Sequence, residues 1–261
     1  MSTIRQVIAT IERLVGHPLN HDEGLHYGTA DREVERILVC WMATPEALTR
    51  AAEIGASLVI AHESLYYPYD AAVRSDNLPG WEDWPTNSQR RALLAAHNLS
   101  LLRVHGSADE LCIYDAFAQT LGLGEPIAGE GLTRVFAIAP CRLADLVARV
   151  KAATGMAALR VAAPRGLEQV VSRVGLPWGG MALFVNVSYQ QQLIALDCDV
   201  MIAGESDNYG LRFCAELGIP LIETSHEVSE NPGLRVFAQR LAGELGLPVS
   251  CYENPLFWRL A

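Results

Sequence analysis

Residues 214–230 have the sequence CAELGIPLIETSHEVSE, in which a helix end, a glycine, a buried strand and a histidine follow one another. Gly218 stops the helix, and the apolar residues after it predict the strand. His226 and Glu230 lie four positions apart beyond this strand, so on a helical turn their side chains point the same way. The stretch therefore predicts a strand that delivers an imidazole and a carboxylate to its carboxyl end.

A second stretch with the same order of features lies far upstream. Residues 51–63, AAEIGASLVIAHE, again give a helix end, a glycine, an apolar strand and a His-Glu pair, His62-Glu63. Helices and strands of this kind are common in α/β proteins, so the repeated His-Glu is the informative part. We predict an internal duplication, with one copy in each half of the chain.

The composition is that of a folded globular protein. The chain has 261 residues, of which 50% are hydrophobic and 19% charged, enough for a large core and two domains. The formal net charge of -10 and the lack of a long Lys/Arg run disfavour a nucleic-acid surface. Six scattered cysteines without a CxxC pair predict reduced thiols. Because the sequence shows neither a signal peptide nor a long apolar run, we expect a cytoplasmic protein without a membrane segment.

Alternating helix and strand patterns predict an α/β fold with two related α/β domains, residues 1–128 and 129–261. Gly129 to Thr133 is the expected joint, and the C-terminal segment is a candidate to pack back on the first domain. Asn231-Pro232-Gly233 is expected to interrupt the helix that starts at His226. Residues 64–86 have no clear period, which is typical of a lid, a binding loop or an oligomer contact.

Three predicted strands, ending at residues 61, 104 and 225, carry side chains that can bind a metal. Ligands bind at this edge of α/β sheets. The candidates are His62, Glu63, His105, Asp109, His226, Glu227 and Glu230. Imidazoles mixed with carboxylates suit Zn, Mn, Fe, Co or Mg. A single His-Glu pair is more simply a helix cap with a surface partner, but two pairs in repeated contexts with a third acid favour metal.

The charge of this set favours two ions over one. Three carboxylates around one divalent ion leave a negative site, whereas two ions leave a positive site able to bind phosphate or another oxyanion. Two metals about 3.5 Å apart lower the pKa of a shared water toward neutrality. Two other features are weaker: His17, His21 and His26 crowd a loop where histidines are usually solvated. Glycines around Pro177-Trp178 allow a ligand or a neighbouring backbone to approach closely.

These motifs together resemble the Nif-three-like family, whose members are often named GTP cyclohydrolase I type 2 homologues. The resemblance covers nearly the whole chain and rests on Asp22-x-Gly24-Leu25, His62-Glu63, His105-x-x-x-Asp109, Gly204-Glu205 and His226-x-x-x-Glu230. It implies two related α/β domains, a dinuclear metal centre between them and a toroidal homohexamer. Carried over by position, the metal ligands are His62, Glu63, Asp109, His226 and Glu230.

The chain departs from the family pattern in two places. The family usually has His-His-Pro where this chain has His62-Glu63-Ser64, and a carboxylate in place of an imidazole shifts the preference toward harder ions. His105 is followed by Gly106-Ser107-Ala108, where the family usually has Thr-Asn-Leu.

The motifs lead us to expect a metal-dependent hydrolase of a small phosphorylated or nucleotide-like substrate. His105 is the catalytic candidate, as a proton shuttle or as a group that supports the ligands. Arg74, Arg90 and Arg91 are candidates to meet phosphate. The alternative is a metal-binding assembly or regulatory protein without turnover, because no Ser or Cys is paired with a base as a nucleophile.

Overall fold

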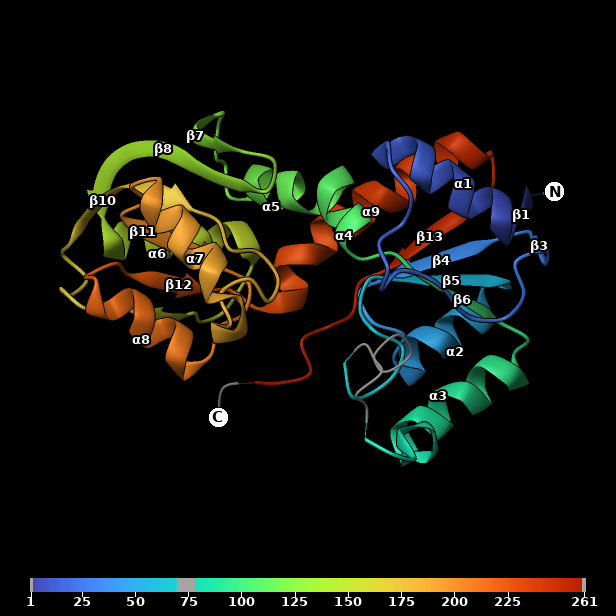
Figure 1. The fold of residues 1–261 in the computed structure, drawn as a ribbon. Coiled ribbons are helices and arrows are strands. Elements are labelled where there is room, and N and C mark those ends of the chain that lie inside the picture. The colour runs from blue at the N-terminus through green and yellow to red at the C-terminus, as the bar shows by residue number, and fades with distance from the viewer. Residues whose placement is uncertain (1, 70–77, 260–261) are drawn as a thin grey trace. The chain divides into compact units, whose positions relative to one another are not determined.

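The computed structural model describes residues 2–69 and 78–259, in two compact units. Unit 1 comprises Met1–Cys112 and Gly233–Asn254, and unit 2 comprises Ile113–Pro232 and Pro255–Ala261. Each unit is built around its own sheet, five-stranded in unit 1 and six-stranded in unit 2 (Figure 1). The predicted α/β class is confirmed. No helix in the described ranges is both long and apolar enough to cross a membrane.

Unit 1 has a mainly parallel sheet. Its strand order is β13 (Val249–Tyr252), β4 (Ile37–Cys40), β5 (Leu58–Ala61), β6 (Ser100–Arg103) and β2 (Gly24–Tyr27), with β2 antiparallel to β6. Ala61 pairs with Cys40 and with Arg103, so β4, β5 and β6 end at one edge. The chain segments that follow β5 and β6 therefore leave the sheet side by side.

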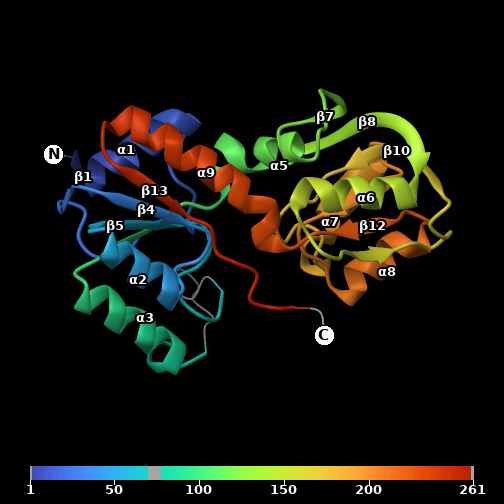
Figure 2. The same cartoon turned by 180° about the vertical axis from the view of Figure 1, so that it is seen from behind.

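Helices cover both faces of this sheet (Figures 1 and 2). α2 (Pro45–Glu53) and α3 (Pro85–Ala96) lie on one face, and α1 (Ile4–Val15) and the unit-1 part of α9 (His226–Leu245) lie on the other. Thr44 is the N-cap of α2, and its hydroxyl accepts from the Ala47 N–H at 3.3 Å. All four residues of β4 and of β5 are buried, as expected for parallel strands covered on both sides.

Unit 2 combines parallel and antiparallel strands. The order is β7 (Pro126–Glu130), β8 (Thr133–Arg142), β10 (Val170–Gly175), β11 (Val200–Ala203), β12 (Leu221–Glu223) and β9 (Arg160–Ala162). β10, β11 and β12 are parallel, and α7 (Val187–Ala195) and α8 (Asn208–Glu216) connect them. α6 (Leu143–Thr154) connects β8 to β9.

Two predicted interruptions are wrong. Gly129 and Glu130 end β7, residues 131–132 form the turn, and Thr133 begins β8, so this stretch is a hairpin inside unit 2 and not a joint between halves. Gly129 and Gly131 have φ +82 and +56, which glycine adopts readily. α9 runs without a break from His226 through Pro232 to Leu245. An interior proline costs about 3 kcal/mol, but Leu234, Phe237 and Leu241 are buried in the same helix. Burial of each such side chain gains about 1.5–3 kcal/mol, which outweighs the proline.

The two sheets share a run of four strands, β4-β5-β6-β2 in unit 1 and β10-β11-β12-β9 in unit 2. In each run three parallel strands are followed by an antiparallel strand that comes earlier in the chain. This order sets β5 against β11 and β6 against β12. His62-Glu63 then corresponds to Gly204-Glu205, and His105-x-x-x-Asp109 to His226-x-x-x-Glu230. The sequence motifs predict that His62 corresponds to His226. The strand order instead makes His62 correspond to Gly204, and His226 to His105. The duplication itself stays a prediction.

Candidate metal centre

The ends of β5 and β6 bring together the unit-1 cluster, which we define as His62, Glu63, His105 and Asp109. His62, Glu63 and His105 each offer a ligand atom, and these three atoms lie within 4.8 Å of one another. His62 Nε2 lies 3.9 Å from Asp109 Oδ1. His62, Glu63 and Asp109 are only 1%, 4% and 6% exposed, whereas the His105 side chain is 29% exposed. Three candidate ligands in unit 1 are thus buried beside a half-buried imidazole.

The ring of His62 is oriented by a hydrogen bond to the main chain. Its Nδ1 lies 3.1 Å from the carbonyl oxygen of Val104. A carbonyl can only accept, so Nδ1 carries the proton and Nε2 keeps its lone pair toward Asp109. Metal-binding histidines typically show this arrangement, with one ring nitrogen donating to a backbone carbonyl or carboxylate.

Unit 2 holds the unit-2 cluster, which we define as Glu205, His226 and Glu230. β12 ends at Glu223, and α9 begins at His226, so the predicted helical turn is confirmed. His226 Nε2 lies 3.3 Å from Glu230 Oε1, and His226 Nδ1 lies 3.0 Å from Glu205 Oε2. Glu230 is 2% exposed. The second histidine therefore repeats the pattern of the first, with Nδ1 on an acceptor and Nε2 beside a buried carboxylate.

The glycine-rich loop after β10 packs directly on the unit-2 cluster. Gly179 has φ +49, and a Cβ at this position would lie 2.0 Å from Glu230 Oε1 and 3.1 Å from His226 Nε2. The Gly179 N–H donates to Ser229 Oγ at 2.9 Å, and the Gly179 carbonyl accepts from the Glu205 N–H at 2.7 Å. The close approach predicted from the glycines is thus to α9 of the same unit. No phosphate cradle is needed to explain it.

The donor set of the two clusters fits a divalent ion. Imidazole nitrogens and carboxylate oxygens make up both clusters, and the six cysteines are free thiols outside them. Burying carboxylates is costly unless positive charge accompanies them, and a divalent ion supplies such charge. Glu227, the remaining candidate, accepts from the Ser225 hydroxyl at the start of α9. The set matches the borderline and hard ions that the sequence predicts.

Around His105 lies a hydrogen-bond and ion-pair network that the sequence does not predict. It consists of Arg103, Asp22 and Tyr69. Arg103 is fully buried, pairs with Asp22 Oδ2 at 3.0 Å, and donates to the Tyr69 hydroxyl at 2.7 Å and to the His62 carbonyl at 3.3 Å. His105 Nδ1 lies 3.4 Å from the same Asp22 oxygen. The only signal in the sequence is a charged residue at the end of the apolar strand Ser100–Arg103, which says nothing of its partners. Arg103 thereby links the main chain of one candidate ligand to the carboxylate that holds His105.

The hydrogen bond with His105 and the charge of Arg103 lower the pKa of Asp22 to about 2, although partial burial opposes this shift. Asp22 is therefore ionised at neutral pH and holds the His105 ring by Nδ1. The neighbouring Glu23 accepts from the N–H groups of His105 and Ser107 at 2.6 and 2.9 Å. The two acids of the Asp22-x-Gly24 motif thus fix the side chain and the backbone of His105.

Replacing Asp22 with Asn tests this ion pair through the pH dependence of stability. The folded-state pKa lies below the ordinary 3.8, so the carboxylate stabilises the fold above about pH 4, and this contribution is lost as the pH falls toward 2. In urea denaturation with chelator, we expect Asp22→Asn to unfold at lower urea than the wild type near pH 6, with the gap closing in acid. Asp31→Asn, which alters an exposed ion pair with Arg5, is the control and should show no such gap. Equal midpoints near pH 6 would contradict the ion pair.

The other predicted residues lie outside the clusters. Arg90 is buried and donates to the Leu65 carbonyl at 2.6 Å, so it supports the loop after β5 and belongs to neither cluster. Arg91 lies 3.6 Å from Asp83, and Arg74 falls outside the described residues. His17 pairs with Glu110 at 3.0 Å. Among the described residues, neither His17, His21 nor His26 belongs to a group that could hold a metal.

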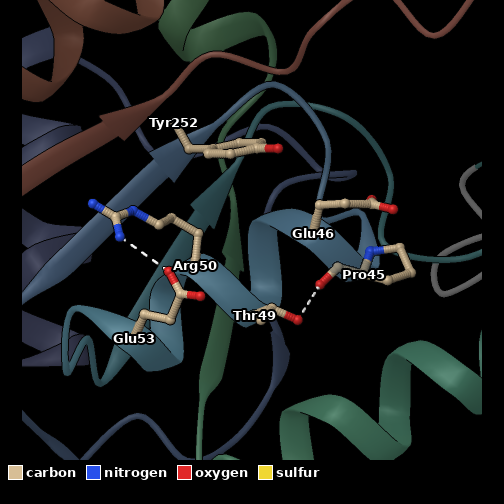
Figure 3. Close-up of a pocket in the computed structure, with 6 residues that line it drawn as sticks. All are labelled: Pro45, Glu46, Thr49, Arg50, Glu53 and Tyr252. Atoms are coloured by element: carbon tan, nitrogen blue, oxygen red, sulfur yellow. Dashed lines mark hydrogen bonds and ion pairs between the residues drawn. The ribbon is translucent and has the colours of Figure 1, made fainter.

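A shallow hollow of about 420 Å³ in unit 1 lies between α2 and β13 (Figure 3). Thr49 and Arg50 in its wall bond to Pro45 and Glu53 of the same helix, at 2.8 and 3.0 Å. Its lining contains no residue of either cluster. Because these polar groups already pair along α2, we assign this hollow no function.

The fold and the clusters define an α/β protein with two histidine–carboxylate groups, and comparison with known proteins agrees. The profile of the Duf34/NIF3 (NGG1p interacting factor 3) family matches residues 2–255. A GTP cyclohydrolase 1 type 2 homolog of Clostridium perfringens is 22% identical over 258 residues, which cover 93% of this chain and 92% of that protein. The chain belongs to the Duf34/NIF3 family, as the resemblance of its motifs predicts.

Solved structures share the fold. A Bacillus cereus protein related to NIF3 superposes with a TM-score of 0.80 at 13% identity, over 100% of this chain and 99% of that one. Protein ybgI, described as of unknown function, gives a TM-score of 0.78 at 21% identity, over 97% and 99% of the two chains. At such identities the likeness establishes the architecture and leaves the chemistry to the site.

Proposed function

We propose that this chain is a divalent-metal-binding protein that hydrolyses a small phosphorylated or nucleotide-like substrate. The observation that carries the proposal is the shared orientation of His62 and His226. Each ring gives Nδ1 to an oxygen acceptor and turns Nε2 toward a buried carboxylate. Histidines that cap helices or fill cores have no need of this arrangement, whereas metal-binding histidines do.

The ligands in this proposal are His62, Glu63, Asp109, His226 and Glu230. We propose two divalent ions per chain, because their charge exceeds that of the three carboxylates. The surplus positive charge suits a phosphate or another oxyanion. The relatives named GTP cyclohydrolase 1 type 2 homologs support a nucleotide-like substrate.

Bound divalent ions supply Lewis-acid charge, which makes water a nucleophile near neutral pH and stabilises phosphate oxygens. The chain itself contributes oriented groups around that charge. The His62 and His226 rings are fixed by Val104 and Glu205. His105, held by ionised Asp22, is accessible enough to carry a proton to or from a bound molecule. We further propose that the protein is cytoplasmic and forms a homo-oligomer, a hexamer by resemblance. Light scattering of the metal-loaded protein would test the oligomeric state.

A panel of nucleotides and phosphoesters tests the proposed reaction. Metal-loaded wild type should release phosphate or open the ring of at least one substrate, because the ligands hold the charge that activates water. Glu230→Ala, which removes a buried carboxylate of the unit-2 cluster, should lose at least about 100-fold of that rate. Glu216→Ala changes an exposed glutamate and should leave the rate unchanged. Metal-loaded protein without turnover on the whole panel would favour the non-catalytic alternative.

A further inference from the structure

Two tyrosines in the loop after β5 have closely similar surroundings. Tyr67 and Tyr69 are 40% and 46% exposed. Arg90 Cζ lies 4.8 Å from the ring centre of Tyr67, and Arg103 Cζ lies 5.0 Å from that of Tyr69. Each arginine also reaches the phenol oxygen, at 3.4 Å for Tyr67 and 2.7 Å for Tyr69. The two residues thus form a natural pair for comparison.

Tyr69 differs from Tyr67 by its contact with the unit-1 cluster. Its hydroxyl lies 3.4 Å from His105 Nε2, and the two rings meet edge to face at 6.3 Å. The His105 ring in turn lies 4.7 Å from the ring of His62. Tyr67 instead points its hydroxyl toward the sulfur of Met42, at 3.6 Å. Tyr69 is therefore the tyrosine of this pair that stands at the candidate site.

The hydrogen bond from Arg103 leaves the Tyr69 hydroxyl able to act as a donor. A guanidinium only donates, so the phenol oxygen accepts from Arg103, and the hydroxyl can itself donate to His105 Nε2. A separation of 3.4 Å is long for such a bond, so giving up this contact with His105 for a stronger acceptor costs little. A donor that already accepts from a cation is also polarised and donates more strongly.

The exposed fractions of the side chains at the candidate site indicate which of them a bound molecule contacts first. His62, Glu63 and Asp109 are at most 6% exposed, whereas Tyr69 is 46% exposed. Arg103 is buried under the phenol ring and shares its charge with Asp22, so it acts on a ligand through the hydroxyl. A neutral but polarised O–H beside imidazoles is suited to an anionic oxygen.

We propose that Tyr69 is a substrate-contacting residue, whose hydroxyl donates a hydrogen bond to a phosphate oxygen of the substrate. This inference rests on the proposed function and adds a named contact to it. Arg103 polarises the hydroxyl. When no ligand is present, the hydroxyl donates to His105 Nε2, and Asp22 holds the other ring nitrogen of His105.

Inorganic phosphate is the probe, and Tyr69→Phe with Tyr67→Phe is the matched pair of variants. Each substitution removes one oxygen and keeps the ring over its arginine, so both variants should fold. Equilibrium dialysis of metal-loaded protein should show the dissociation constant for phosphate rising about tenfold or more in Tyr69→Phe, the effect of losing a hydrogen bond to a charged group. Tyr67→Phe should stay within about twofold of the wild type. Elemental analysis should find unchanged metal in both variants.

The outcomes separate this inference from the proposed function. Equal phosphate affinity in both variants overturns the role of Tyr69 and leaves the metal-dependent hydrolase in place. Loss of metal together with phosphate in Tyr69→Phe also overturns the inference, because the hydroxyl would then support the metal ligands. A wild type that holds metal but binds no phosphate overturns the phosphate contact alone. A wild type that holds no divalent metal overturns both.

Discussion

Replacing His226 with Ala is expected to remove most of the divalent metal from the purified protein. The substitution deletes Nε2, which lies 3.3 Å from Glu230 Oε1, and leaves that carboxylate buried without its imidazole neighbour. Removing a group that merely orients a ligand weakens metal binding about 10- to 100-fold, so removing a ligand should cost at least about 100-fold. Elemental analysis after dialysis against a metal buffer measures the effect. We expect a clear fall in ions per chain relative to the wild type.

His97→Ala is the control for this experiment. His97 ends α3 in unit 1 and is exposed, so its loss should leave the metal content unchanged. Glu205→Ala is an informative intermediate, because it keeps His226 but removes the acceptor 3.0 Å from Nδ1, and it should weaken metal binding by about 10- to 100-fold. If the His226→Ala variant keeps the wild-type metal content, His226 is not a metal ligand, and the proposed function loses its basis in metal binding.

The positions of the candidate ligands can be predicted because buried parallel strands have an easily recognised sequence pattern. A short apolar run bounded by glycine marks a buried strand, and the next polar residue must lie at the sheet edge. His62 follows β5 directly, and His226 opens α9 with two residues between it and the end of β12, as expected from this rule. The four-residue spacing then places Glu230 beside His226 without further information.

The network around His105 could not be predicted in the same way. Arg103 ends a fully buried strand, where an apolar side chain would be expected, and its partners Asp22 and Tyr69 lie 81 and 34 residues away in the chain. Nothing in a periodic pattern identifies which distant acid compensates a buried cation. Pro232 is the opposite case: this local helix breaker predicts a break, but the apolar face that follows it keeps α9 continuous. Long-range packing decides both cases.

Replacing Gly179 with Ala should disturb both stability and metal binding. The new methyl group would lie 2.0 Å from Glu230 Oε1, the oxygen that faces His226 Nε2, so the carboxylate must leave its place. Overpacking of a buried site costs about 1–3 kcal/mol, and an alanine at φ +49 adds about 1–2 kcal/mol. Urea denaturation should therefore show a loss of about 2–5 kcal/mol in the free energy of unfolding. Elemental analysis should show reduced metal, because Glu230 is a proposed ligand.

Gly155→Ala separates the clash from the backbone strain. Gly155 ends α6 in the same unit with φ +69, and a Cβ there would meet no atom within 4 Å. This variant should lose only the backbone term of about 1–2 kcal/mol and keep the full metal content. If Gly179→Ala behaves like Gly155→Ala in both measurements, Glu230 can move without consequence, and the loop after β10 does not hold the unit-2 cluster in place. If Gly179→Ala loses metal and Gly155→Ala does not, the loop after β10 holds the proposed ligand Glu230 in place.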